Sequence, residues 1–266
     1  EELGELKVTE AQLSGLAVKS QKIRDLLIKT GSVYRYEIVE DTRVLAARCL
    51  ATFDLLAATE LFEKIAFDRR EYCGQRIEAA KELLKGENSY IGLEALRELS
   101  IEAEGYQSRF EAAVLALEFS NCDEDRQLVS EVIAKYHPPE KPYDYMLGKA
   151  ARLGFGDFSI PLIKAEIEEI LLQHEQPKTS QRFSDLWEFT YCCETLSSIG
   201  LPKDVIGYCE RLLSCTTISN EQVPEILSAM KKMGFSSEME LLLKDEAIRK
   251  RLSASKGSAT FNFFAE

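Results

Sequence analysis

Apolar residues recur every three or four positions along almost the whole chain, and polar residues fill the positions between them. This period is that of an amphipathic α-helix, and no stretch sustains the two-residue alternation of a half-buried strand. Glycine, proline, asparagine and serine separate the periodic stretches at intervals of about one helix length. The pattern predicts an all-α protein, with a helical stretch at about 9–31 and helices at about 37–52, 54–66, 70–85, 88–103, 107–120, 123–136, 141–153, 158–175, 180–199, 202–215, 220–233 and 237–254.

Three of these predicted helices carry the same short pattern at intervals of 33 residues. The segments that begin at Arg43, Arg76 and Arg109 read RVLAARCLA, RIEAAKELL and RFEAAVLAL. In each of them an apolar residue, an alanine and a leucine share one helical face, and the small alanine lets a neighbouring helix approach closely. The three sets are Val44, Ala47 and Leu50, then Ile77, Ala80 and Leu83 or Leu84, then Phe110, Ala113 and Leu117.

A second helix lies between successive copies, and it repeats as well. The segment ATELFEKIA from Ala58 aligns with GLEALRELS from Gly92 at an interval of 34 residues. A two-helix unit of this size cannot bury its apolar face alone, whereas stacked copies can. The recurrence therefore predicts a helical hairpin that is repeated along an axis.

This hairpin resembles the HEAT repeat, whose second helix opens with arginine and continues through paired alanines to leucine. The resemblance implies a right-handed α-α superhelix (an α-solenoid) of about six to seven HEAT-like helical hairpins, with the second helices on the concave side. It also implies that Arg43, Arg76 and Arg109 are structural and pair with carboxylates such as Asp41 or Asp68. HEAT-like proteins serve many unrelated functions, so the resemblance predicts a shape and not a reaction.

The regularity of the pattern varies along the chain and suggests four regions. The repeats are regular over 37–136, and residues 1–36 are expected to form N-terminal capping helices. The segment HPPEKP then interrupts the count, and residues 137–254 keep hairpin-like lengths but lose the motif. Residues 255–266 lack periodicity and are expected to form a C-terminal tail. Because the chain begins with Glu1 and not with Met, we expect it to be part of a larger multidomain protein.

Composition and charge narrow the class of partner. The chain is 45% hydrophobic and 29% charged, as in folded soluble proteins, and no apolar run approaches the roughly 20 residues of a membrane-spanning helix. The net charge of −12 is spread along the chain, whereas nucleic-acid binders present a basic face. We therefore expect no membrane or nucleic-acid partner, and favour a protein partner with a basic surface.

The seven cysteines and two small motifs predict no reaction. The cysteines are odd in number, irregularly spaced and without CxxC, which indicates free thiols in a reducing cytoplasm. Gly154 and Gly156 lack the preceding strand and third glycine of a dinucleotide-binding turn, so we interpret them as a flexible loop between helices. The adjacent Cys192 and Cys193 point about 100° apart on a helix and cannot chelate one metal ion together. Buried packing of this pair is favoured over a redox-sensing or modified thiol.

The histidines and the clustered acidic residues also have structural interpretations that need no catalytic or metal-binding role. His137 and His174 each lie at a predicted helix end, where surface capping is the favoured interpretation. The acidic pair Glu168 and Glu169 and the acidic run 123–125 resemble solvated faces or helix starts and not a carboxylate dyad. No catalytic, metal-binding or cofactor-binding residue is therefore predicted, and no cofactor is expected.

Two features of the second half suggest contact surfaces. The basic cluster KDEAIRKRLSASK at 244–256 is interpreted as a solvated terminal helix, with contact to an anionic partner as the alternative. Trp187 has Phe183, Phe189 and Tyr191 nearby in the sequence, which favours the core of a hairpin. If Trp187 is exposed, it becomes the first candidate for a binding hot spot, because tryptophan and tyrosine dominate interface energetics.

The predicted function is that of a non-catalytic scaffold or adaptor, which binds another protein on the concave face of the repeats. Glu78, Lys81, Glu82 and Glu111 are the predicted solvent-facing residues of that face, and Trp187 completes the predicted partner-binding set. One alternative is a sensor or regulatory repeat segment of a larger NTPase-type signalling protein. Another is an all-helical lyase or cofactor-handling enzyme, which would need convergent polar groups that the sequence does not reveal.

Overall fold

The computed structural model describes residues 26–29, 42–138, 140–175 and 186–254. Within them all regular structure is helical and no strand occurs, as the sequence pattern predicts. None of the described helices combines the length and the apolar composition that crossing a bilayer requires. The chain divides into two compact units, the first ending at Tyr143 and the second beginning at Asp144.

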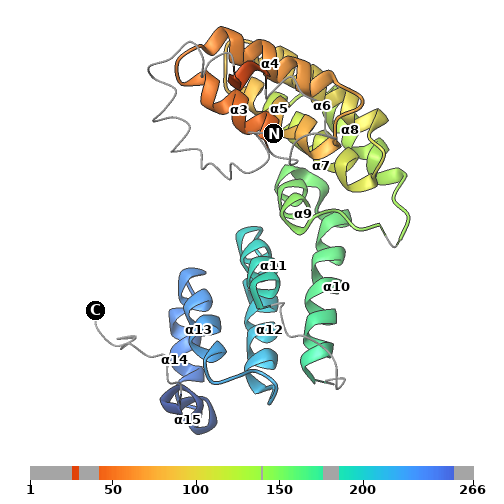
Figure 1. Ribbon diagram of the computed structural model, residues 1–266. Coiled ribbons are helices and arrows are strands. Elements are labelled where there is room, and N and C mark those ends of the chain that lie inside the picture. Colours follow the sequence, from red (N-terminus) through yellow and green to blue (C-terminus); the bar gives the residue numbers. More distant parts are fainter. Residues whose placement is uncertain (1–25, 30–41, 139, 176–185, 255–266) are drawn as a thin grey trace. The chain divides into compact units, whose positions relative to one another are not determined.

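The described helices of the first unit pack in two layers (Figure 1). Each helix packs against the next one along the chain and also against the one after that, so α3, α5 and α7 form one layer and α4, α6 and α8 the other. A short helical segment at 26–29 contacts α3 through Leu27, which packs against Ala46 and Cys49. The bounds are α3 (Thr42–Ala51), α4 (Leu55–Phe67), α5 (Cys73–Leu84), α6 (Ser89–Glu102), α7 (Tyr106–Ser120) and α8 (Asp123–Ala134).

Small residues lie where these layers meet. The alanines that recur at intervals of 33 residues, Ala47, Ala80 and Ala113, lie on α3, α5 and α7 and are fully buried. Gly92 on α6 lies against α5, and a Cβ atom added to it would come within 2.6 Å of the Ala80 carbonyl oxygen. The same atom would lie 2.9 Å from the backbone nitrogen of Leu84. Helices α5 and α6 therefore approach backbone to backbone, which only a residue without a side chain permits at this point.

Two of the three repeated arginines tie consecutive helices together. Buried Arg43 on α3 pairs with Glu71 and lies 3.7 Å from the carboxylate of Asp68, which is one of the two carboxylates that the HEAT resemblance suggested. Buried Arg76 on α5 donates to the Ala66 carbonyl at 2.9 Å and, like Arg43, pairs with an acidic side chain (Glu102, at 3.0 Å). Each guanidinium donates hydrogen bonds to carboxylate or carbonyl oxygens at a helix end and so stabilises the turn between two helices.

The third repeated arginine does not form the ion pairs that the first two form. Arg109 on α7 is half-buried and forms no ion pair within the described residues. Asp41, the other suggested partner, lies outside the described residues.

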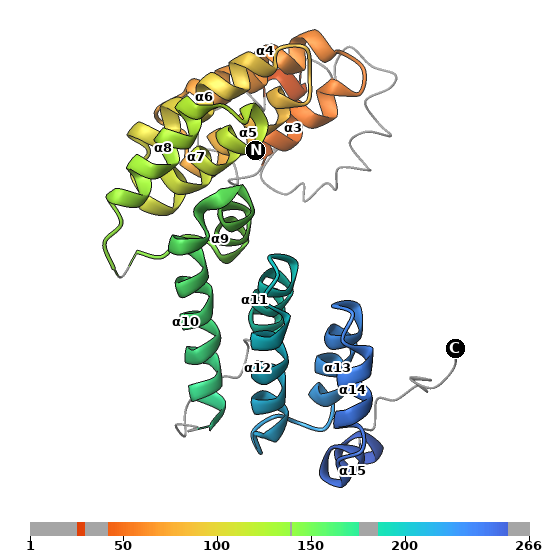
Figure 2. The ribbon, with the colours of Figure 1, turned by 180° about the vertical axis from the view of Figure 1, so that it is seen from behind.

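The second unit repeats the same packing rule with longer connections. Its helices again contact both the next helix and the one after it: α9 contacts α11, α10 contacts α12, and α11 contacts α13 (Figure 2). In Figure 2 these helices run from green α9 to blue α15. The bounds are α9 (Asp144–Ala150), α10 (Gly156–Glu175), α11 (Leu186–Ser198), α12 (Pro202–Ser214), α13 (Gln222–Lys232), α14 (Ser236–Leu242) and α15 (Glu246–Ala254).

The connections of the second unit correct two sequence expectations. In place of the expected flexible loop at Gly154 and Gly156, the short segment η1 (Ala151–Phe155) forms a kink between two helices, in which Gly154 takes a left-handed φ of 99°, while Gly156 is helical and begins α10. Glycine is the residue that adopts this conformation without strain. The single helix expected at 237–254 is two helices: α14 ends at Leu242, and Asp245 accepts a hydrogen bond from the Ala247 backbone nitrogen at 2.7 Å, which caps the start of α15.

The close approach of α5 and α6 makes a direct prediction. Gly92→Ala should destabilise the first unit by about 1–3 kcal/mol, because the added methyl group meets backbone atoms that cannot move aside. The matched control is Gly207→Ala on α12, where an added Cβ atom has nothing within 4 Å. This control should be neutral or up to about 1 kcal/mol more stable, because alanine favours a helix. Urea unfolding followed by circular dichroism measures both, and equal stability of the two variants would contradict the packing described.

Candidate functional site

Three of the predicted partner-binding residues, Glu78, Lys81 and Glu82, lie together on α5. Arg48 of α3 reaches across to two of them, with its Nη2 atom 2.8 Å from Glu78 and its Nε atom 2.7 Å from Glu82. Lys81 pairs with Glu78 at 2.5 Å and Lys85 pairs with Glu82 at 2.8 Å. These five side chains form what we call the α3–α5 charge network.

Contacts within the charge network favour the charged forms of Arg48 and Glu78. Partial burial lowers the pKa of Arg48, but hydrogen bonds to Glu82 and Glu78 outweigh this and raise the pKa above its ordinary value. Partial burial likewise raises the pKa of Glu78, but the contacts with Lys81 and Arg48 outweigh it and the pKa lies below its ordinary value. The carboxylates of Glu78 and Glu82 are therefore committed to holding α3 against α5, and they are less available to a partner than free surface acids.

The prediction that Glu111 faces solvent is wrong. Its residue surface is only 8% exposed, because the middle of α7, residues 110–117, is buried on all sides. Val114 and Leu115 of α7 stand 33 residues after Lys81 and Glu82 of α5, and both are buried. A helix that is apolar on all sides has no solvent face to offer, so Glu111 is not part of an exposed partner-binding set.

The core position that the sequence favoured for Trp187 is also wrong. The core face of α11 consists of Phe189, Cys192, Cys193 and Leu196, and Trp187 points away from it with 75% of its surface exposed. Its ring stacks on Tyr191, at a centroid distance of 5.7 Å. Trp187 is thus available as a contact residue, but it belongs to the second unit and not to the charge network.

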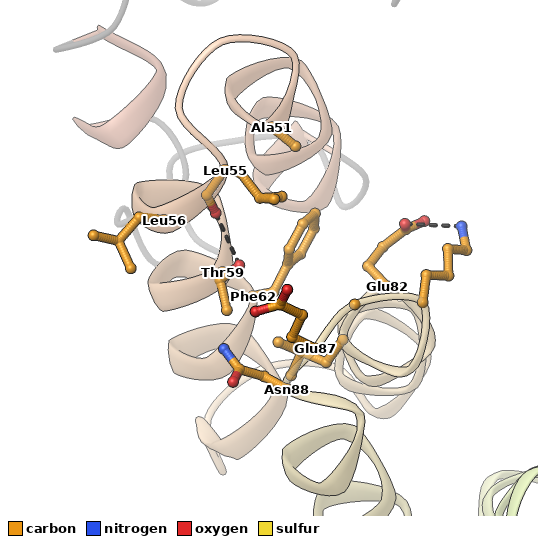
Figure 3. Close-up of a pocket in the computed structure, with 11 residues that line it drawn as sticks. Ala51, Leu55, Leu56, Thr59, Phe62, Glu82, Glu87 and Asn88 are labelled. Carbon is orange, nitrogen blue, oxygen red and sulfur yellow. Dashed lines mark hydrogen bonds and ion pairs between the residues drawn. The ribbon is translucent and has the colours of Figure 1, made fainter.

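A cleft at one end of the first unit brings the predicted partner-binding residue Glu82 together with residues that the sequence did not predict for binding. The cleft has a volume of about 820 Å³ and lies between the α3–α4 turn and the α5–α6 turn (Figure 3). Its lining residues are Ala51, Leu55, Leu56, Thr59, Phe62, Glu82, Leu83, Lys85, Gly86, Glu87 and Asn88. A smaller hollow of about 400 Å³ shares four of them and also includes Arg48, so the cleft, which we call the hairpin-end cleft, adjoins the charge network.

Two leucines of this cleft are unusually exposed. Leu55 and Leu56 keep 69% and 73% of their surface accessible, although they open a helix whose apolar stripe is fully packed. Asp54 sets their position, because its side chain accepts a hydrogen bond from the Ala57 backbone nitrogen at 3.0 Å and so starts α4. The leucines therefore occupy the first helical turn, beyond the reach of the core. Neighbouring apolar side chains exposed in a cleft indicate an interaction site, whereas isolated exposed apolar residues are common on any protein surface.

The cysteines and the acidic and histidine side chains do not form a reactive or metal-binding site within the described residues. All seven cysteines are free, and Cys192 and Cys193 are buried, in agreement with the packing interpretation. A hydrogen bond with Cys209 and burial both raise the pKa of Cys193, so its thiol stays protonated and unreactive. Within the part of the chain that the structure describes, no group of three or more His, Cys, Asp or Glu side chains is placed to hold a metal ion.

The two histidines differ from each other. His137 is exposed after the end of α8, as expected of a surface residue. His174 is buried, which corrects its assignment to the surface. The hydroxyl of Thr217 donates to the His174 carbonyl at 2.8 Å and lies 3.2 Å from the His174 Nδ1 atom. This pair closes the end of α10 against the chain that follows α12, which is a structural role.

The two acidic candidates are ion-paired across helices. Glu168 on α10 binds Arg211 of α12 at 2.9 Å, while the neighbouring Glu169 is exposed. Asp125 is almost fully buried, in contrast to the solvated face expected for the run 123–125. Both of its carboxylate oxygens accept from Arg97 of α6, at 2.7 and 2.8 Å. This pair fastens α6 to α8 and resembles neither a dyad nor a metal site.

No protein-family model, no curated protein and no solved structure matches this chain. Its function must therefore be argued from its own residues.

The signal for the hairpin-end cleft was present in the sequence. Ala58, Leu61, Phe62 and Ile65 form the packed stripe of α4, and Leu55 and Leu56 precede it next to Asp54, a residue type that starts helices. Leu56 lies off this stripe, so the sequence indicates its exposure, whereas Leu55 is in phase with Ala58 and Phe62 and its exposure comes from its place in the first turn. The facing turn with Glu87 and Asn88 lies more than 30 residues away, and only the stacking of hairpins brings the two together.

The buried Arg97–Asp125 pair predicts how acid affects the first unit. Burial raises the pKa of Asp125, but hydrogen bonds from Arg97, Ser120 and Cys122 outweigh it and the pKa lies below its ordinary value. A carboxyl group whose pKa is lower in the folded chain stabilises the fold above its unfolded pKa, near 4, and this contribution is lost as the pH falls through the folded pKa. The unfolding free energy should therefore decline as the pH is lowered below about 5.

Asp125→Asn should remove about 1–3 kcal/mol at pH 7 and flatten this acid dependence. Asp123→Asn, which alters an exposed neighbour, is the matched control. It should leave the unfolding free energy at pH 7 and its acid dependence nearly unchanged. Urea unfolding at several pH values between 3 and 7 measures the effect. An acid dependence as steep in Asp125→Asn as in the wild type would show that the pair does not contribute.

Proposed function

We propose that this chain is a non-catalytic scaffold built as a HEAT-like α-solenoid of about six to seven hairpins, and that the first unit binds a partner protein at the hairpin-end cleft. The observation that carries the proposal is the exposure of Leu55 and Leu56 above a concave surface floored by Phe62 and Leu83. Covering such side chains removes apolar surface from water and stabilises a complex.

The packing rule of the helices supports the solenoid. Each described helix from α3 to α8 contacts its first and second neighbours along the chain, as the members of stacked hairpins do. By the HEAT resemblance the layer of α3, α5 and α7 is the concave one. The charge network with Glu78, Lys81 and Glu82 belongs to this layer, and the hairpin-end cleft adjoins it.

Among the described residues that line the cleft, Glu87 is an unpaired carboxylate, but no free nucleophile or second unpaired acid accompanies it, which favours binding over catalysis. The hydroxyl of Thr59 donates to the Leu55 carbonyl at 2.8 Å, and Glu82 is held by Arg48 and Lys85. Neither group is free to act as an acid, base or nucleophile on a bound molecule. In keeping with the seven free thiols, we place the protein in a reducing compartment such as the cytoplasm.

Photo-crosslinking tests the proposal at the residue that carries it. A photoreactive phenylalanine derivative in place of Leu56 should yield discrete adducts with one or a few proteins when the purified chain is irradiated in native lysate. The same substitution at Leu241, an exposed leucine on α14 of the second unit, is the control. No adduct from position 56, or the same adducts from both positions, would refute binding at the cleft.

A further inference from the structure

The hairpin-end cleft combines apolar side chains with one charge that has no ion pair among the residues that the structure describes. Three charged residues line it, and two of them, Glu82 and Lys85, pair with each other. Glu87 is exposed and forms no ion pair within the described residues, and its carboxylate points into the cleft (Figure 3). A carboxylate beside apolar surface, with no cation of its own, is open to a cation that a partner brings.

A second exposed carboxylate lies close in sequence to a residue that lines the cleft. Glu60 follows Leu56 by one helical turn on α4, is exposed, and also forms no ion pair within the described residues. The chain as a whole carries a net charge of −12, so its field favours the approach of a basic partner. A second copy of this chain would bring a further net charge of −12 toward a cleft that contains Glu87, and an anionic lipid surface would be repelled as well.

We propose that the hairpin-end cleft binds a partner segment in which neighbouring aliphatic side chains lie beside a lysine or arginine. This inference rests on the proposed scaffold function. The aliphatic side chains contact Leu55, Leu56 and Phe62, and the basic group pairs with Glu87. A volume of about 820 Å³ holds several side chains and suits a peptide segment.

A displayed random library of 16-residue peptides, panned against the full chain, tests this chemistry. The enriched peptides should share two aliphatic residues with a lysine or arginine nearby, and they should be depleted in acidic residues. Leu55→Ser/Leu56→Ser should lower the retention of these peptides about tenfold or more, because it removes the apolar contact. Leu241→Ser, which alters an exposed leucine of the second unit, should not change retention.

Substitutions of Glu87 separate the charge from the apolar contact. Glu87→Gln should reduce retention of the basic peptides about fivefold and Glu87→Lys should reduce it further, while purely aliphatic peptides stay unaffected. Glu94→Gln, at an exposed carboxylate of α6 outside the cleft, is the matched control. Circular dichroism of each variant confirms that it is folded.

The outcomes distinguish this inference from the scaffold function. Peptides that need the two leucines but have no basic residue, or that ignore Glu87→Gln, overturn the charge pairing and leave the scaffold intact. An absence of leucine-dependent peptides overturns this inference, whereas the crosslinking experiment decides the scaffold function separately. Self-association that Leu55→Ser/Leu56→Ser abolishes would assign the cleft to a second copy and also overturn the inference.

Discussion

The close approach of α5 and α6 is the constraint on which the rest of the first unit depends. At Gly92 the two backbones are so near that a single added carbon atom would collide with the Ala80 carbonyl. Such contact is possible only because small residues recur at the same helical position in successive hairpins. It sets the spacing of the two layers, and the spacing in turn decides which side chains from neighbouring hairpins meet.

Ion pairs then hold the closely packed helices together. Arg43 and Arg76 are buried at helix ends, where they bind carboxylates and a backbone carbonyl of the adjacent turn. Arg48 and Arg97 act further along the helices and link neighbouring helices of the same layer, α3 to α5 through Glu82 and α6 to α8 through Asp125. Some of the chain's carboxylates are therefore paired with arginines inside the fold. Exposed acids such as Glu60 and Glu87, which have no ion pair within the described residues, are the ones that a basic molecule would contact.

The all-helical class was predictable because it depends on the periodicity of apolar residues, and the repeated motif goes further and predicts stacked hairpins. An alanine every 33 residues needs no knowledge of distant contacts to indicate stacked hairpins. The errors arose where one copy departs from the others: α7 replaces the charged positions of α5 with Val114 and Leu115, and this buries Glu111. Trp187 was misplaced because its aromatic neighbours were counted without regard to helical phase. The cleft was missed because its two walls are distant in sequence.

The central claim is that small residues in register stack the hairpins of the first unit at short distance. A crystal structure of the chain tests this most directly. The account predicts that Ala47, Ala80 and Ala113 lie in equivalent positions of one layer, with Gly92 against the Ala80 carbonyl. A closed bundle in which these three alanines have unrelated neighbours would contradict it.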